Sequence, residues 1–145
     1  MTFIFDLDGT LFDLEHRLHF IQQDPPDWDG FYDALGEDDL IEEVAEVYRS
    51  LKNAGHYIIL ATGRPERVRF KTVQKLHQND LYFNSLYMRP DGDHREDSIV
   101  KAEMLKYILQ FESKVIDGVF EDRQSVVDMW RSKGLRVFQV APGKF

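Results

Sequence analysis

The sequence contains no cysteine, and this absence excludes disulfide bonds and thiolate chemistry. Proteins without cysteine are common in reducing compartments, so we expect an intracellular, cytoplasmic protein. No apolar run approaches the roughly 20 residues that a membrane-spanning helix needs, and we therefore expect no membrane partner. The N-terminus enters a strand-like pattern at once, which is not typical of a signal peptide.

The chain also lacks an excess of basic residues. Its 18 lysines and arginines are outnumbered by 26 aspartates and glutamates, which gives a net charge of −8. Proteins that coat long nucleic acids usually carry positive charge, so a broad duplex-binding surface is disfavoured. Binding of a single phosphorylated end is not excluded, because a metal ion bound by an acidic site supplies positive charge there. No internal repeat or linker interrupts the sequence, and we expect one domain, 1–145.

An Asp-x-Asp pair follows the first apolar run. The run Phe3–Phe5 predicts a short buried strand, and Gly9 allows the backbone to turn sharply after it. Side chains two apart on a strand share a face, so we expect Asp6 and Asp8 to point to one spot, with Leu7 packed inside. Two close carboxylates repel unless a cation intervenes, and Mg²⁺ suits such oxygen ligands. Taken alone, the pattern is also typical of an ordinary Asp-rich turn.

Strand and helix patterns alternate along the rest of the chain. Helical spacing covers 38–53, 66–79, 98–111 and 124–133, and strand patterns cover 57–61, 84–88, 115–120 and 135–140. This alternation predicts an α/β fold with a mostly parallel sheet and helices on both faces. In such folds ligands bind beyond the carboxyl ends of the strands. Polar residues follow three of the strands, namely Asp6 and Asp8, Thr62 and Arg64, and Glu121 and Asp122.

The segment 11–36 shows the least periodicity of the chain, and we expect short helical turns and loop over the carboxyl end of the first strand. Its aromatic residues are Trp28, Phe31 and Tyr32. Filling the edge of the core is the more common role of such residues. Stacking on a substrate base is the alternative.

Together, the polar strand ends would suit phosphoryl chemistry. Asp6 and Asp122, with the main-chain carbonyl of Asp8, could hold Mg²⁺. One carboxylate of the Asp-x-Asp pair could attack phosphorus and form an aspartyl-phosphate, while its neighbour protonates the leaving oxygen and later deprotonates water. Thr62 could bind a phosphoryl oxygen, and Lys101 could add positive charge. Taken singly, Thr62 is more typical of a helix cap and Lys101 of a solvated surface than of a catalytic site.

The ordered motifs resemble those of the haloacid dehalogenase-like superfamily of phosphotransferases. They are Asp6-Leu7-Asp8-Gly9-Thr10, Thr62-Gly63-Arg64, Lys101 and Glu121-Asp122. The resemblance implies a nucleophile at Asp6, a general acid/base at Asp8, phosphate binders at Thr62 and Lys101, and a Mg²⁺ ligand at Asp122 supported by Glu121. It also implies a Rossmann-like sheet of about five strands in the order 5-4-1-2-3, counted along the chain. The short insert after the first motif implies a minimal cap, and thus an open site that takes large substrates or is completed by an oligomer.

A closer resemblance is to the 3′-phosphatase domain of bacteriophage-type polynucleotide kinase-phosphatases. The stretches that carry it are 95–101, 121–134 and 138–145. This resemblance implies phosphate binding by Arg17 and by Arg64 beside Gly63, and a site-organising role for Asp97. The fourth motif departs from that family, because it reads Glu-Asp where the family has Asp-Asp, and we expect only a slight change in metal geometry.

The hypothesis is therefore a Mg²⁺-dependent phosphomonoesterase that removes 3′-phosphates from DNA or RNA ends. The chain lacks Gly-x-x-x-x-Gly-Lys-[Ser/Thr], so we expect no kinase activity of its own and a separate kinase or ligase partner. A phosphatase of nucleotides or sugar phosphates and a non-catalytic module that binds phosphorylated ends remain alternatives. A phospho-receiver domain is disfavoured, because the third strand ends in Met88-Arg89 without an acid.

Overall fold

The computed structural model describes residues 1–143, and its centre is a five-stranded sheet in the order β5-β4-β1-β6-β7. The strands are β1 (Thr2–Phe5), β4 (Tyr57–Pro65), β5 (Ser85–Arg89), β6 (Gly118–Arg123) and β7 (Val137–Gly143). All neighbouring pairs are parallel. These are the five expected strands, so the expected α/β fold and strand order are confirmed.

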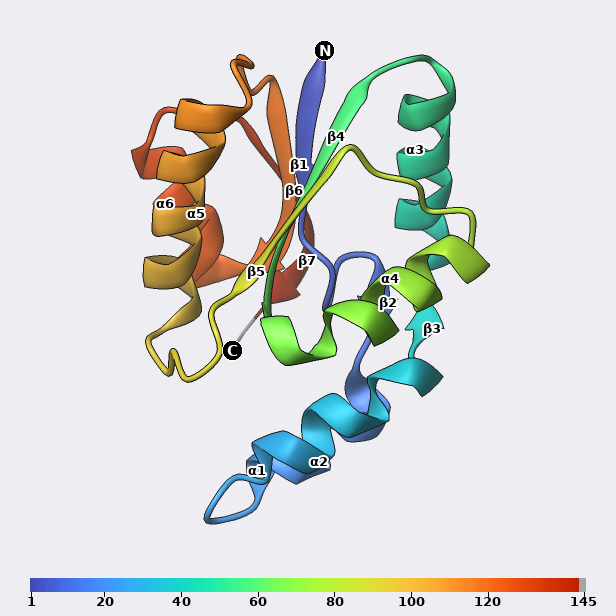
Figure 1. Ribbon diagram of the computed structural model, residues 1–145, viewed down its shortest axis with the longest axis vertical. Helices are drawn as coiled ribbons and strands as arrows, with labels where there is room; N and C mark the ends of the chain where they lie inside the picture. Colours follow the sequence, from blue (N-terminus) through green and yellow to red (C-terminus); the bar gives the residue numbers. More distant parts are fainter. Residues whose placement is uncertain (144–145) are drawn as a thin grey trace.

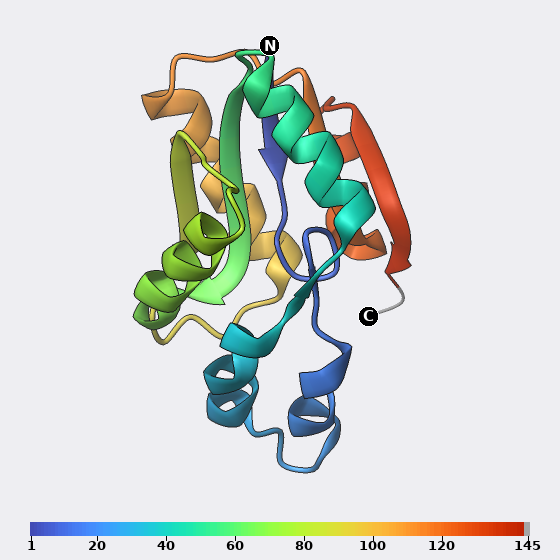
Figure 2. The ribbon, with the colours of Figure 1, turned by 90° about the vertical axis from the view of Figure 1, so that its right-hand side faces the viewer.

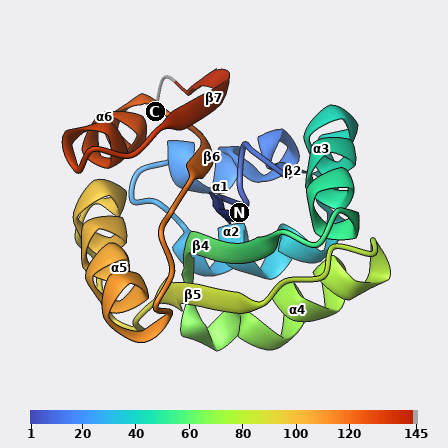
Figure 3. The ribbon, with the colours of Figure 1, turned by 90° about the horizontal axis from the view of Figure 1, so that it is seen from above.

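Helices cover both faces of the sheet, as Figures 1 and 3 show. One face carries α3 (Glu42–Asn53) and α4 (Arg69–Gln78), and the other carries α5 (Asp97–Phe111) and α6 (Gln124–Ser132). Because alternate side chains of a strand point to opposite faces, β1 contributes to both cores. Phe5 packs with Tyr48 of α3, whereas Ile4 belongs to the cluster that contains Trp130 of α6. Burial on both faces explains why this strand is an unbroken apolar run.

Several boundaries differ from the expected ones. The helix expected at 38–53 begins at Glu42, because Asp39–Leu40 pairs as strand β3 with β2 (Phe12–Asp13) in an antiparallel ribbon. The helix expected at 66–79 begins with a 3₁₀ turn, Glu66–Val68. Strands β4, β6 and β7 continue beyond the expected ends, and the pairing of β4 and of β6 resumes after an irregularity at the polar motif. The last two residues of the C-terminal stretch, 144 and 145, lie outside the described part of the chain.

A small lobe lies beyond the carboxyl ends of the strands, joined to the sheet through β2 and β3 (Figure 2). It spans residues 14–38 and is called the cap lobe below. Its elements are η1 (Glu15–Arg17), α1 (His19–Gln22), α2 (Trp28–Asp33) and η2 (Ala34–Glu37). The expected short helical turns and minimal cap are thus present. No helix within residues 1–143 has the length and apolar character that crossing a membrane requires.

Candidate active site

The motif residues meet around one cavity at the carboxyl edge of the sheet. Its volume is about 150 Å³, and it is lined by Asp6, Asp8, Thr62 and Asp122 from the strand ends and by cap-lobe residues including Phe31. Asp6 directly follows β1, while Thr62 belongs to β4 and Asp122 to β6. The expectation that Asp6 and Asp8 serve one site agrees with this arrangement, since both side chains line the same cavity.

A tight loop after β1 sets the positions of both aspartates. The carbonyl oxygen of Leu7 accepts hydrogen bonds from the amides of Thr10, Leu11 and Phe12. Gly9 has a φ of 82°, and a Cβ atom there would lie 2.1 Å from Oδ2 of Asp122. Glycine is therefore required both by the backbone conformation and by the close approach of the loop to β6.

Asp6 is buried and held at both carboxylate oxygens. Its Oδ1 accepts a hydrogen bond of 2.7 Å from Nζ of Lys101, and its Oδ2 accepts one of 2.9 Å from Oγ1 of Thr10. The Thr10 hydroxyl also lies 3.4 Å from Oδ1 of Asp122. These contacts fix the rotamer of Asp6 while each oxygen keeps a second lone pair, as a nucleophilic carboxylate needs.

Lys101 is fully buried among acids and not solvated on the surface. Besides Asp6, its Nζ atom contacts Oε2 of Glu121 at 2.8 Å and Oδ2 of Asp97 at 3.5 Å. Burial lowers the pKa of Lys101, but Asp6, Asp97 and Glu121 outweigh that effect and hold it well above its usual value. The side chain is thus a permanent positive charge next to the oxygen of Asp6.

Glu121 supports this lysine from behind. Its Oε2 also accepts from Nε1 of Trp130 at 3.4 Å, and its Oε1 accepts from the amides of Asp122 and Arg123. Donors on both oxygens fix this carboxylate where it holds Lys101, at the edge of the cavity that Glu121 helps to line. This contact pattern agrees with the supporting role expected for Glu121.

Asp6, which follows β1, and the two acids of β6 form a group that suits a divalent cation. One carboxylate oxygen each of Asp6, Glu121 and Asp122 lie within 4.8 Å of one another, and all three residues are buried. Burial and the charge of Asp6 raise the pKa of Asp122 to about 7. Such crowding of buried carboxylates is relieved by a bound cation with a preference for oxygen ligands. The donor set therefore fits Mg²⁺.

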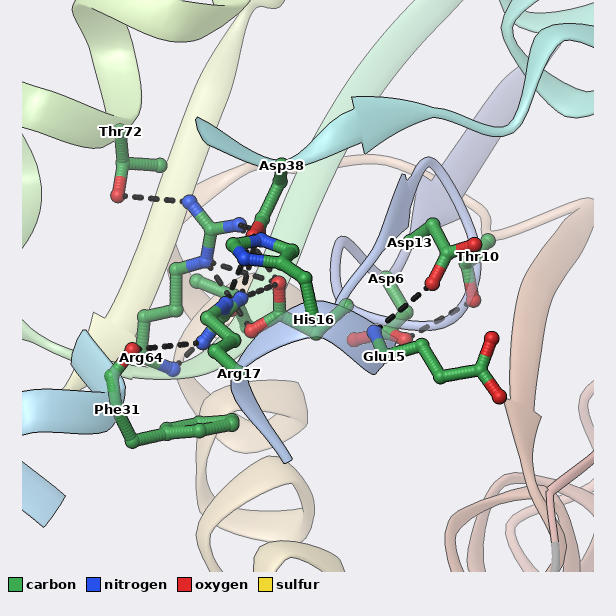
Figure 4. Close-up of polar contacts among 12 residues, drawn as sticks. Asp6, Thr10, Asp13, Glu15, His16, Arg17, Phe31, Asp38, Arg64 and Thr72 are labelled. Atoms are coloured by element: carbon green, nitrogen blue, oxygen red, sulfur yellow. Dashed lines mark hydrogen bonds and ion pairs between the residues drawn. The ribbon is translucent and has the colours of Figure 1, made fainter. Parts of the chain in front are cut away.

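Asp8 faces a pair of buried arginines, Arg17 and Arg64. Figure 4 shows these two arginines close together beside Asp38. The Asp8 carboxylate accepts from Nη2 of Arg64 at 2.6 Å and from Nη2 of Arg17 at 2.8 Å. Burial raises the pKa of Asp8, but Arg64 and Arg17 outweigh that effect and hold it below its usual value. Asp8 is consequently an ionised carboxylate in the free chain. Its charged partners are two arginines, whereas the charged partner of Asp6 is Lys101.

Asp38 accepts hydrogen bonds from both arginines. It was not selected as a site residue from the sequence. Its Oδ1 accepts from Nε of Arg17 at 2.8 Å and contacts Nε2 of His16 at 2.6 Å, while its Oδ2 accepts from Nη2 of Arg64 at 3.3 Å. Asp38 is 1% exposed. In the sequence it looked like one of the acids at a helix start, and no local pattern distinguishes it from its neighbours.

Arg17 and Arg64 therefore lie beneath Asp8 and do not line the cavity. Their remaining donors are also engaged, since Nη1 of Arg17 donates to the carbonyl of Phe31 and Nη1 of Arg64 donates to Oγ1 of Thr72. The phosphate-binding role that the resemblance implied for both stays a prediction. Both guanidinium groups contact the Asp8 carboxylate.

Thr62, Gly63 and Asp97 meet on the other wall of the cavity. The Thr62 hydroxyl accepts from the amide of Arg64 at 3.1 Å, and a Cβ atom on Gly63 would lie 2.3 Å from Oδ1 of Asp97. Arg89, which the sequence reasoning did not select, donates to the Gly63 carbonyl at 2.8 Å and to Asp97 at 3.3 Å. It was noticed only as a non-acidic residue at the third strand end, yet it lines the cavity.

Comparison with known proteins identifies relatives over the full length. The family model described as the polynucleotide kinase PNKP phosphatase domain matches residues 1–145. A chain of the Pnkp1/Rnl/Hen1 RNA repair complex is 32% identical with a TM-score of 0.84, and the match covers 99% of this chain and 43% of that one. A chain of another Pnkp1/Rnl/Hen1 complex structure is 34% identical with a TM-score of 0.82, covering 99% and 46%.

A more distant neighbour shares the fold. The class C acid phosphatase from Bacillus anthracis with tungstate bound is 14% identical with a TM-score of 0.72, and the match covers 99% of this chain and 66% of that one. The match to the two Pnkp1/Rnl/Hen1 chains covers less than half of the length of each of them.

Proposed function

Because the chain belongs to the family of polynucleotide kinase PNKP phosphatase domains, we propose that this phosphatase removes 3′-phosphates from polynucleotide ends with Mg²⁺ as its cofactor. The observation that carries the proposal is the fixed carboxylate of Asp6. This carboxylate lines the cavity, and its two oxygens accept hydrogen bonds from Lys101 and Thr10. Asp8, two residues further along the chain, lines the same cavity. A nucleophile in a set orientation beside a second carboxylate supports phosphoryl transfer through a covalent intermediate.

In the first step, an oxygen of Asp6 attacks phosphorus and the bond between phosphorus and the ester oxygen breaks. Asp8 gives a proton to the departing alkoxide, which leaves as the free hydroxyl. The negative phosphoryl group next to Asp8 opposes the two arginines and raises the pKa of this carboxyl, so that it carries a proton when substrate is bound. Lys101 offsets the charge that remains on the phosphoryl oxygens.

In the second step, water attacks the phosphorus of the aspartyl-phosphate. Asp8, now ionised, takes a proton from the water, and the bond between phosphorus and Asp6 breaks. Inorganic phosphate leaves, and Asp6 returns to the carboxylate. The buried arginine pair supports this half of the cycle, because it favours the ionised form of Asp8.

Asp6, Asp122 and the main-chain carbonyl of Asp8 would hold Mg²⁺, with Glu121 supporting the group. When bound, the ion would offset the negative charge of the phosphoryl group and of the crowded carboxylates. Thr62 and Gly63 line the cavity and would offer hydrogen bonds to phosphoryl oxygens, while Asp97 would organise this wall through Lys101 and Arg89.

The relatives support an RNA end as the substrate and a partner enzyme. One of them belongs to a Pnkp1/Rnl/Hen1 RNA repair complex and another to a Pnkp1/Rnl/Hen1 complex, and both chains are more than twice as long as the part that matches. We propose by analogy that this domain acts beside a kinase or ligase activity, inside the cell.

A phosphatase of free nucleotides or sugar phosphates is the second candidate. The net charge of −8 favours it, because such a surface repels a long polyanion. A module that only binds phosphorylated ends is less well supported, since Asp6, Asp8 and Lys101 are all positioned for chemistry.

The test is phosphate release from an oligonucleotide with a 3′-phosphate, beside one with a 5′-phosphate and free 3′-mononucleotide. We expect a preference for the 3′-end, loss of release in a chelator, and a loss of at least about 10³-fold in Asp6→Asn because no covalent intermediate forms. Glu46→Gln, an exposed acid on α3, is the control and should keep wild-type activity. Better turnover of the mononucleotide would favour the second candidate, and an active Asp6→Asn would refute the mechanism.

A further inference from the structure

A second cavity adjoins the candidate active site and shares part of its lining. Its volume is about 390 Å³, and it lies between the cap lobe and the loop that follows β5. Trp28, Tyr32, Arg89, Asp97 and Arg123 line both this cavity and the one that contains Asp6. A group attached to a phosphate at Asp6 would therefore extend into it. The name outer groove is used below for this cavity, which Trp28, Tyr32 and the loop 90–96 border.

Trp28 presents an exposed aromatic surface at the junction of the two cavities. Its side chain is 48% exposed, whereas the neighbouring Phe31 is 5% exposed. The Trp28 ring stacks on Tyr32, with centroids 6.0 Å apart and planes at 24°, and meets Phe31 edge-on at 5.7 Å. Phe31 is thus buried in the lobe, whereas Trp28 and Tyr32 border the outer groove and Trp28 exposes its ring there.

This aromatic surface is held firmly relative to the reacting carboxylates. The guanidinium of Arg17 lies 4.3 Å from the centre of the Phe31 ring, and its Nη1 donates to the Phe31 carbonyl. The same guanidinium binds Asp8. On the outer side, Arg67 lies 5.6 Å from the centre of the Tyr32 ring and pairs with Asp29 at 2.9 Å. A stacking surface that is preorganised in this way loses little entropy on binding.

The charges of the outer groove select against a phosphate backbone as its occupant. Its walls contain the arginines Arg67, Arg89, Arg95 and Arg123 and the acids Asp29, Asp91, Asp93, Glu96 and Asp97. The acids also engage these arginines, as in the pairs of Arg95 with Asp93 at 2.7 Å and Arg89 with Asp97 at 3.3 Å. Without an excess of positive charge, the groove suits a neutral, flat group more than a polyanion.

We propose that the outer groove binds the nucleobase of the 3′-terminal nucleotide, stacked on Trp28, while its phosphate lies at Asp6. This inference rests on the proposed function and adds a base-recognition site to it. The base has a π-face whatever its identity, so stacking on Trp28 gives affinity for a nucleotide end without sequence preference. It also separates nucleotide ends from phosphomonoesters that carry no base.

Tryptophan fluorescence tests the inference without turnover. Trp28 is exposed and Trp130 is fully buried, so a stacked base should quench the first and leave the second unchanged. In Asp6→Asn chains, which keep the substrate intact, we expect a 3′-phosphorylated dinucleotide to quench the emission and glycerol 2-phosphate to leave it unchanged. Adding Trp28→Phe should abolish the quenching while binding is retained, because phenylalanine still stacks. Quenching that survives in Trp28→Phe, or that needs no base, would overturn the inference.

Steady-state kinetics give the second readout. Trp28→Ala should lower kcat/KM for the 3′-phosphorylated dinucleotide at least about fivefold relative to kcat/KM for glycerol 2-phosphate, which has no ring to stack, mainly through KM, because stacking is lost. Trp28→Phe should recover most of that ratio. Phe70→Ala removes an aromatic side chain that is 80% exposed on α4 and borders a different cavity, and it should leave the ratio unchanged.

The outcomes separate the inference from the function on which it rests. A wild-type chain that hydrolyses the 3′-phosphate while Trp28→Ala keeps the wild-type ratio overturns the inference alone. Base-dependent quenching without hydrolysis of any monoester supports the groove and overturns the proposed phosphatase function. A chain that neither binds nor hydrolyses the dinucleotide overturns both.

Discussion

At the scale of single residues, Asp38 organises the site without facing the cavity. It is the shared acceptor of Arg17, Arg64 and His16, and both arginines reach Asp8. A buried carboxylate between two buried guanidinium groups does more than balance charge, because it sets the position from which they hold Asp8. We therefore regard Asp38 as a positioning residue for the proposed reaction.

Replacing Asp38 with alanine should leave two buried guanidinium groups without their shared partner. We expect a loss of about 3–5 kcal/mol in the free energy of unfolding, from the cost of breaking a buried ion pair. Asp38→Asn keeps the size and one acceptor, so it should fold, yet kcat should fall about 100-fold because Asp8 moves. Urea unfolding and phosphate release measure the two effects.

Asp39→Asn is the matched control, since Asp39 is adjacent and exposed. It should change neither quantity. An Asp38→Asn chain with the kcat of the wild type and an unchanged pH profile would show that Asp38 serves stability alone.

The sequence allowed part of this site to be predicted at the residue scale. Asp6, Asp8 and Asp122 were selected because each follows or ends a strand pattern in a recognisable motif, and the structure brings all of them to one cavity. Asp38 and Arg89 were not selected. Their importance depends on partners that lie 21 and 26 positions away, and no short-range pattern carries that information.

At the scale of elements, the loop after β1 and the strand β6 approach each other closely. This contact brings Asp122 toward Asp6 and depends on the missing side chain of Gly9. The sequence indicated a sharp turn at this glycine, but its contact with β6 is a tertiary feature. The helix expected at 38–53 shows the same limit, because pairing between β2 and β3 replaces its first turn.

Gly9→Ala tests the close approach. Its φ of 82° strains an alanine, and the new Cβ atom would displace the Asp122 carboxylate. We expect a loss of about 1–3 kcal/mol in the free energy of unfolding and a loss of phosphatase activity of at least about tenfold. Gly55→Ala is the control, because Gly55 has a φ of 89° but nothing within 4 Å of the added atom. It should lose similar stability and keep its activity. Equal losses of activity in both variants would mean that strain alone explains the effect.

At the scale of the whole molecule, the buried acids Asp6, Glu121 and Asp122 make the stability of the fold depend on pH and on metal binding. Burial and Asp6 raise the pKa of Asp122 to about 7 from its usual value of 3.8. The metal-free folded chain therefore binds more protons than the unfolded chain between these values. The contribution of Asp122 to the free energy of unfolding is therefore present at low pH and is lost as the pH rises toward 7. Asp8 acts in the opposite direction, but its lowered pKa confines its effect to more acidic conditions.

We therefore expect the Tm of the metal-free protein to fall by a few degrees between pH 5.5 and pH 8 through this group. Mg²⁺ binds the ionised carboxylates, so it should raise Tm more at pH 8 than at pH 5.5. Asp122→Asn removes the titrating group and should reduce both the pH dependence and the response to Mg²⁺. Differential scanning fluorimetry over this range, with Glu46→Gln as the charge-matched control, measures both quantities. A response to Mg²⁺ that is equal at the two pH values, or unchanged in Asp122→Asn, would contradict the assignment of this group as the metal site.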